Sequence, residues 1–161
     1  MGKKKRGQRS RASVTDAYGN TWVGVAPAGR RDVEAAEAAL GLTLPAELAE
    51  LMMTLGAGRP AKSYYFSRDN DIEIELGYVI PLLAQPRIGD LVQECETYRR
   101  VHGLAPELIP FALDSGHANL LCLRLPAGDV VYWLHDEPER RVRTVAPSLV
   151  ALLQGLTEPP Y

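Results

Sequence analysis

The sequence lacks the motifs that identify most enzymes and metal proteins. Its 161 residues include two cysteines and three histidines, and none of them lies in a CxxC or HExxH pattern. No GxSxG, P-loop or GxGxxG motif is present, so there is neither a nucleophile elbow nor a glycine-rich phosphate loop. These absences predict a protein that is not an enzyme and that uses no metal and no cofactor.

Long apolar runs are missing as well. No segment approaches the roughly 18 apolar residues that a membrane-spanning helix needs, so we expect no transmembrane segment. The basic N-terminus is not followed by the apolar stretch of a secretory signal. Cys95 and Cys122 both lie within apolar patterns, which indicates two reduced thiols in the core. We therefore expect a cytoplasmic protein.

Acidic residues are absent from the first eleven residues, which hold six lysines and arginines. The remaining residues include 12 basic and 20 acidic side chains, a net charge of −8, whereas the whole chain carries −2. We interpret residues 1–15 as a basic, disordered tail and residues 16–161 as a single domain. Three roles are compatible with such a tail: it is simply solvated, it binds nucleic acid weakly, or it serves as a targeting signal. The acidic body itself repels nucleic acid and attracts basic surfaces.

A helix–corner–helix pattern is the strongest structural signal in the chain. Apolar residues at helical spacing predict one helix over Asp32–Leu40 and a second over Pro45–Leu55. Gly41 stands where a left-handed residue commonly ends a helix, and Pro45 begins the next helix, where a missing N–H costs nothing. The segment is therefore predicted to be a packing unit with no room for an active site.

Strand patterns dominate the middle of the chain, and a helix closes it. Strict alternation over Asp71–Leu76 predicts a half-buried strand, and Pro110 within another strand predicts an edge or a bulge. This order of elements predicts the α+β class, with an N-terminal helix pair, a twisted antiparallel β-sheet and a C-terminal helix. The other expected elements are strands at Thr21–Val25, Ser63–Phe66, Leu108–Leu113, Asn119–Leu125, Val130–Leu134 and Val142–Val145, and helices at Ile88–His102 and Pro147–Leu156.

An ordered set of short motifs, spread over about residues 30–157, resembles one known family. The set comprises Glu37, Gly41-Leu42, Leu44-Pro45, Leu55-Gly56, Leu108–Ala112, Asp114–Gly116, Asn119, Val130–Trp133 and the closing helix Ala146–Leu156. On these residues the chain resembles the SUKH superfamily of Smi/Knr-type domains. The resemblance implies a SUKH-like single domain of the α+β class.

The resemblance implies a function as well as a fold. Many bacterial members are immunity proteins, which act in the cytoplasm, bind a toxin domain and neutralise it. The toxins are often nucleases or nucleic-acid deaminases. Some eukaryotic relatives are instead regulators and scaffolds. We therefore expect a bacterial immunity protein, with a non-catalytic scaffold that binds another intracellular partner as the alternative.

Four acidic residues alternate along one predicted strand and indicate where a toxin would bind. With a period of two, Asp69, Asp71, Glu73 and Glu75 project to the same side and create a strong negative field. We hypothesise that this face docks on the basic substrate cleft of the toxin and occludes its active site. A solvated strand face is the plain alternative. A calcium loop is disfavoured because its glycine and its terminal glutamate are both missing.

Residues from two other segments extend this candidate toxin-binding site. Asp136, Glu137 and Glu139 follow a predicted strand and enlarge the acidic patch. A buried aromatic residue, Trp133 or Tyr65, is expected to supply the affinity anchor, while charges at the rim speed association. Plain core packing is the alternative for Trp133. For the run 64–66 we expect one face in the core and the other exposed.

The run Asp114-Ser115-Gly116-His117 contains the residue types of a catalytic triad. Triad members come from separate elements and are recognised by geometry, not by closeness in the sequence. We therefore interpret this run as a turn that polar side chains stabilise.

Overall fold

The computed structural model describes residues 13–161. Residues 1–12, the greater part of the predicted basic tail, lie outside the described residues. The last three residues of that predicted tail, Ser13–Thr15, form strand β1 and pair with strand β2, Thr21–Val23. These three residues therefore belong to the folded part. So short a strand of mostly small residues has no apolar pattern by which it could be predicted.

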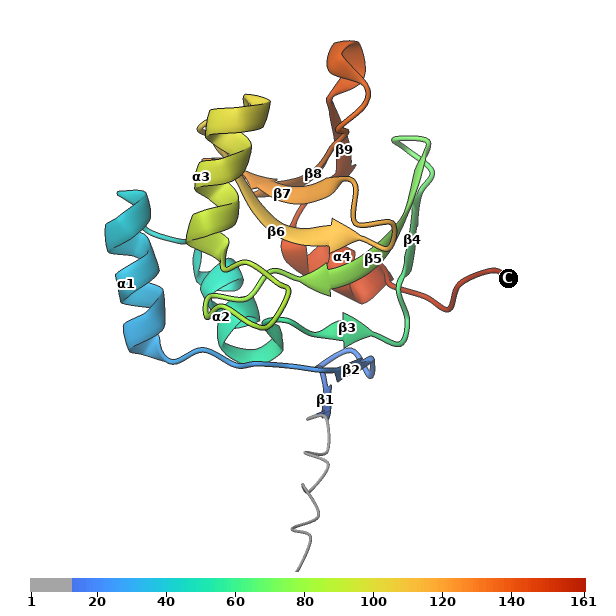
Figure 1. The fold of residues 1–161 in the computed structure, drawn as a ribbon. Coiled ribbons are helices and arrows are strands. Elements are labelled where there is room, and N and C mark those ends of the chain that lie inside the picture. The colour runs from blue at the N-terminus through green and yellow to red at the C-terminus, as the bar shows by residue number, and fades with distance from the viewer. Residues whose placement is uncertain (1–12) are drawn as a thin grey trace, which may run out of the picture.

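Within the described residues, four helices and two antiparallel sheets form the fold, which confirms the α+β class (Figure 1). The larger sheet has the strand order β4-β5-β6-β7-β8-β9, so each strand pairs with the next along the chain. The smaller sheet has the order β1-β2-β3. The remaining elements are α1 Arg30–Leu40, α2 Ala46–Leu55, β3 Arg59–Pro60, β4 Tyr64–Ser67, β5 Ile72–Val79, α3 Leu91–His102, β6 Leu108–Asp114, β7 Leu120–Arg124, β8 Asp129–Trp133, a 3₁₀ helix Pro138–Arg140, β9 Val142–Ala146 and α4 Leu149–Gly155.

The predicted helix–corner–helix is confirmed, and one glutamate holds its corner. Gly41 ends α1 with a left-handed backbone, φ 69°, and its N–H donates to the carbonyl of Glu37 at 2.9 Å. The Glu37 carboxylate accepts the N–H of Leu44 at 2.8 Å. Pro45 lies at the N-cap of α2. The corner therefore satisfies polar backbone groups that the end of one helix and the start of the next would otherwise leave unpaired.

The core lies on both faces of the central strands. All seven residues of β6 are buried, which requires cover on both sides of the sheet. Helix α3 packs on one face of β6, and α4 lies on the other side of the sheet (Figure 1). Cys95 of α3 and Cys122 of β7 are buried free thiols, as predicted, and burial raises the pKa of Cys95 to about 11.

Most boundaries differ from those of the predicted elements by one to three residues. Helix α3 begins at Leu91 rather than Ile88, because the Asp90 carboxylate caps it by accepting the N–H of Gln93 at 2.9 Å. Strand β5 continues past a bulge to Val79. Pro110 lies in a central strand, so the edge alternative is wrong, but the register shift beside it confirms the bulge.

The helices of the described residues are short. The longest, α3, has 12 residues, and none has the length and apolar content to cross a membrane.

Candidate protein interface on strands β4 and β5

The hairpin of β4 and β5 has one buried face and one exposed face. Along β5, Ile72 and Ile74 are buried, whereas Glu73 is exposed and Glu75 is partly exposed, which confirms the predicted alternation. The register pairs Phe66 with Glu73 and Tyr64 with Glu75. Directly opposite residues project to the same face of a sheet, so two aromatic side chains stand beside the two carboxylates.

Tyrosine hydroxyl groups hold both carboxylates in place. The hydroxyl of Tyr64 donates to Glu73, and the hydroxyl of Tyr161 donates to Glu75. The Ser63 hydroxyl donates to the other oxygen of Glu75 at 3.4 Å. The hydrogen bond to each carboxylate raises the pKa of Tyr64 and of Tyr161, because a tyrosinate would face a second negative charge. The carboxylates are therefore positioned side chains rather than freely rotating ones.

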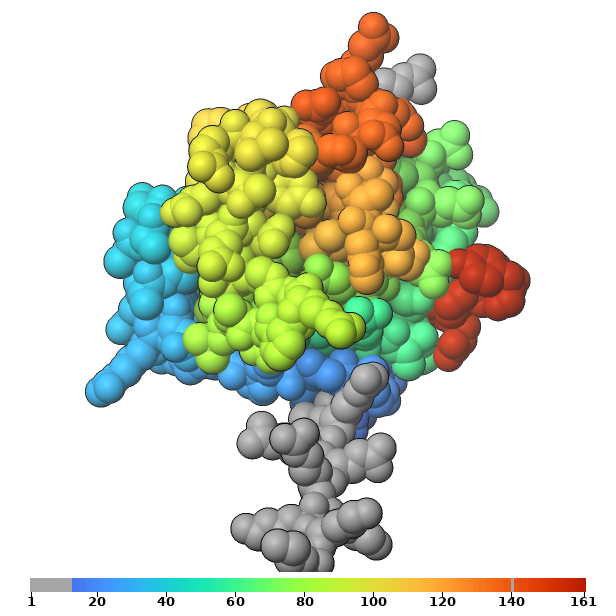
Figure 2. All heavy atoms as spheres, viewed as in Figure 1, coloured from blue at the N-terminus to red at the C-terminus, as the bar shows by residue number. Residues whose placement is uncertain are grey.

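The surface around these carboxylates is aromatic. The side chain of Phe66 is 52% exposed and that of Tyr161 is 87% exposed. The C-terminal segment that carries Tyr161 lies against this part of the molecule, where Thr157 bridges to Tyr64 (Figures 1 and 2). We call the set Tyr64, Phe66, Glu73, Glu75 and Tyr161 the outer face. Exposed aromatic residues beside a few charges are typical of protein interfaces.

Asp69 and Asp71 are not part of the outer face, contrary to the prediction. They lie in the turn that joins β4 to β5, and the strand begins only at Ile72. Asp71 has φ 46°, so the extended alternation does not reach it. Its carbonyl accepts a hydrogen bond from Arg143 of β9 at 3.0 Å. Both aspartates are exposed at the hairpin tip, where they add charge beside the outer face.

Neither of the two predicted aromatic anchors lies on the outer face. Trp133 is 1% exposed and packs edge-to-face on Tyr98 of α3, with ring centroids 5.6 Å apart. Tyr65 projects to the opposite side of β4, where its ring lies against Gly155 of α4. Trp133 is therefore a core residue and not a surface anchor. The partly buried Tyr65 mainly packs against α4.

The run 64–66 has one face in the core and the other exposed, as predicted, but neither Phe66 nor Tyr161 was predicted as a site residue. Phe66 could have been found, since the expected alternation over 64–66 leaves one side of that run exposed, and pairing with Glu73 then identifies the side. No sequence signal identifies Tyr161, because its contact with Glu75 joins segments 86 positions apart.

The remaining predicted acidic residues form a separate projection. Asp136, Glu137 and Glu139 are exposed in the loop between β8 and β9. Figure 1 shows this loop and the turn between β4 and β5 as two separate projections at the same end of the molecule. The base of the loop is fixed where Arg141 donates to the carbonyl of His102 at 3.2 Å. The loop therefore lies at the C-terminal end of α3 and is not continuous with the outer face.

The Asp114–His117 run is a polar turn, as interpreted from the sequence. The Asp114 carboxylate accepts the N–H of Ala118 at 3.0 Å, the side-chain amide of Asn119 at 2.9 Å and the hydroxyl of Tyr132 at 2.5 Å. The His117 ring instead packs edge-to-face on Tyr78, with centroids 5.2 Å apart. Asp114 is thus occupied by groups that close the turn and does not orient the histidine.

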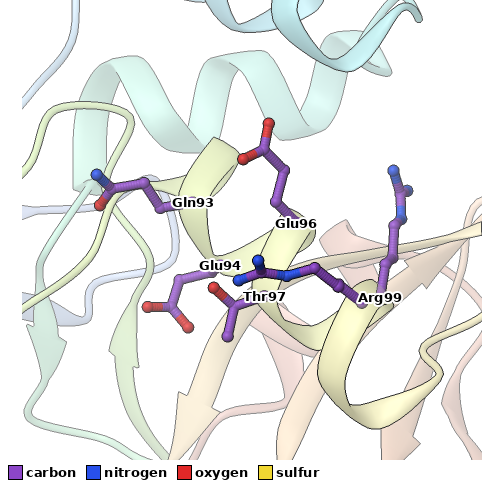
Figure 3. A pocket seen from close by; sticks show the side chains of 6 residues that line it. Gln93, Glu94, Glu96, Thr97 and Arg99 are labelled. Carbon is purple, nitrogen blue, oxygen red and sulfur yellow. The ribbon is translucent and has the colours of Figure 1, made fainter.

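Two surface hollows elsewhere in residues 13–161 do not bring reactive groups together. One hollow runs along α3 and is lined by residues of that helix alone, among them Gln93, Glu96 and Arg99 (Figure 3). A second, of about 350 Å³, lies between β1, α2 and α4, with Glu47 and Leu153 among its lining residues. Within residues 13–161, no three side chains of the His, Cys, Asp and Glu types are grouped to hold a metal ion. The outer face is therefore the strongest candidate site.

Comparison with known families gives a match over most of the chain. A sequence model described as the SMI1 / KNR4 family (SUKH-1) matches residues 27–155. This range contains all four helices and the whole six-stranded sheet. A comparison with curated proteins finds no match.

Proposed function

This chain belongs to the SMI1/KNR4 family (SUKH-1), and on that premise we propose that it is an immunity protein. It binds a toxin domain in the cytoplasm of a bacterium and neutralises it without catalysis. The toxin acts on nucleic acid, as a nuclease or a deaminase, and the immunity protein occludes its active site.

The observation that carries this proposal is the outer face. It presents Glu73 and Glu75, each held by a tyrosine hydroxyl, next to the exposed ring of Phe66. An enzyme that acts on nucleic acid needs a basic cleft for the phosphate backbone. Fixed carboxylates compete with the phosphates of the nucleic acid for the lysine and arginine side chains of this cleft, and the toxin cannot cleave them. Because they are already held in place, they lose little rotational freedom on binding.

The charge of the body favours the same kind of partner. Outside the basic N-terminal residues the chain carries a net charge of −8. A field of this sign accelerates encounter with a basic protein and slows encounter with nucleic acid. The aspartates of the hairpin tip and the acidic β8–β9 loop contribute to this long-range attraction. Phe66 contributes affinity by being desolvated in the complex.

Co-expression tests the proposal directly. The tagged protein is expressed with the product of the gene immediately upstream, and both growth and complex formation are measured. We expect growth to be rescued and a stoichiometric complex to be recovered. If the upstream product is toxic and expressed but shows neither rescue nor complex, the immunity function is wrong and a scaffold for another intracellular partner becomes the leading interpretation.

A further inference from the structure

Strand β4 has one edge that pairs with β5 and one edge that faces outward. The carbonyl of Ser63 accepts the N–H of Leu76 at 2.8 Å, so the backbone carbonyl of Ser63 faces β5. The next residue, Tyr64, points the other way, and its N–H and carbonyl pair with Thr157 at 3.1 and 2.8 Å. Backbone groups of successive strand residues alternate between the two edges. Phe66 therefore directs its N–H and its carbonyl to the outward edge, as Tyr64 does.

The outward edge is only half occupied. Thr157 makes an antiparallel bridge to Tyr64, which shows that this edge accepts an extended segment. The chain before Thr157 turns away into α4, and it does not reach the level of Phe66. Within residues 13–161, no group forms a hydrogen bond with the N–H or the carbonyl of Phe66. The ring of the same residue is 52% exposed.

The free half of this edge lacks several of the usual protections against pairing with another chain. Exposed edges are commonly protected by a proline, an edge lysine, a bulge or a covering segment. The sequence of β4, Tyr-Tyr-Phe-Ser, has no charge and no proline, and its pairing with β5 has no bulge. The opposite edge of the sheet, strand β9, is partly covered by contrast. There the side chain of Asn70, from the turn between β4 and β5, donates to the carbonyl of Val145 at 3.4 Å.

We propose that the free half of the β4 edge receives an extended, basic segment of the toxin, which adds to the sheet as a seventh strand. Its backbone pairs with the N–H and carbonyl of Phe66, as in other cases of strand addition. Its alternate side chains meet the outer face, an apolar one on the ring of Phe66 and a lysine or arginine beside Glu73. The inference rests on the proposed function, because that function identifies the partner as a toxin.

Charge selects a basic partner over a second copy of this chain. Two copies joined at β4 would place two acidic bodies side by side, each with a net charge of −8 outside its first eleven residues. Charge of the same sign opposes their association. A segment with alternating lysine or arginine reverses the sign of this interaction, and it matches the basic cleft that the proposed function requires.

Two substitutions at one residue separate backbone pairing from side-chain contact. Phe66→Ala removes the ring and keeps the edge N–H, whereas Phe66→Pro removes both. The proline costs no hydrogen bond to β5, since the N–H of Phe66 faces away from that strand, and proline is tolerated on edge strands. With the toxin encoded immediately upstream as the probe, we expect Phe66→Ala to weaken binding about tenfold. We expect Phe66→Pro to weaken it about tenfold further.

Equal affinities of the alanine and proline variants would overturn strand addition. Amide hydrogen exchange of the wild-type complex provides a second readout that needs no substitution. Toxin binding should slow exchange of the Phe66 amide, and an unchanged rate in a saturated complex would also overturn strand addition. Either of these two results would leave the proposed function intact if substitution of Glu73 still weakened toxin binding. Failure of the wild-type protein to bind the toxin overturns both proposals.

Discussion

One sheet in this molecule serves two purposes, and its strands differ accordingly. Strands β6, β7 and β8 are covered on both faces, by α3 and α4, and nearly all their residues are buried. Strands β4 and β5 are covered on one face only and expose aromatic residues and carboxylates on the other. The comparison teaches that aromatic content alone does not identify a binding surface, because Trp133 and Phe66 lie in the same sheet and only one is exposed.

The largest expected difference between the two regions is in stability. Trp133→Ala removes a fully buried ring that packs on α3, and it should lower the free energy of unfolding by about 3–5 kcal/mol. Phe66→Ala removes a ring that is already half exposed, and it should cost less than about 1 kcal/mol. Urea unfolding of both variants measures the difference. Similar losses for the two variants would contradict the division of the sheet into a core region and a binding region.

The polar turn at the end of β6 should have an intermediate effect. Asp114 is 8% exposed and accepts hydrogen bonds from Asn119 and Tyr132 as well as from the turn backbone. Asp114→Ala leaves these donors without their acceptor and should lower stability by about 2–3 kcal/mol. His117→Ala serves as the control, because the His117 ring packs on Tyr78 and forms no hydrogen bond with the carboxylate of Asp114. If the histidine variant loses as much stability as the aspartate variant, the account of the turn is wrong.

A smaller effect is expected from alkaline pH, and Cys95 of the covered region contributes to it. Burial raises the pKa of Cys95 from 9.0 to about 11 in the folded state. As pH rises, the unfolded protein therefore releases this proton at a lower pH than the folded protein does. Between the two pKa values the folded state binds more protons than the unfolded state. Stability should fall as pH rises from about 9 to 11, by at most about 1.4 kcal/mol per pH unit for this group.

Thiol labelling supplies a direct check of the same burial. Both cysteines should react with iodoacetamide only when urea unfolds the protein, since the thiolate is the reactive form and both thiols are buried. Rapid labelling of the native protein would show that the α3 face of the sheet opens, contrary to the full burial of both thiols.

Local signals account for the parts of the fold that could be predicted. The α1–α2 corner follows from Gly41 and Pro45 beside two apolar stripes, and the face of β5 follows from its alternation. Both patterns depend on residues within about two turns of helix or one strand. The start of α3 was harder to predict, because the apolar spacing extends past the capping residue Asp90.

The candidate site was predicted in part, because it depends on pairing between strands. Glu73 and Glu75 are placed by the pattern of a single strand. Which aromatic residue stands beside them depends on the register of β4 against β5 and on the path of the C-terminal segment. In β8, alternation could not distinguish a core tryptophan from an exposed one, because helices cover both faces of that part of the sheet.

The most direct test of the account is the association rate of the upstream toxin with a charge-reversed outer face. We compare two double variants. The first carries Glu73→Lys and Glu75→Lys on the outer face, and the control carries Glu34→Lys and Glu96→Lys at exposed positions of α1 and α3, which change the net charge equally. The account predicts that reversal on the outer face slows association at least about tenfold at low salt and more than the control does, and that salt reduces the difference. Equal rates for the two double variants, with equal dependence on salt, would contradict the claim that the outer face binds the toxin.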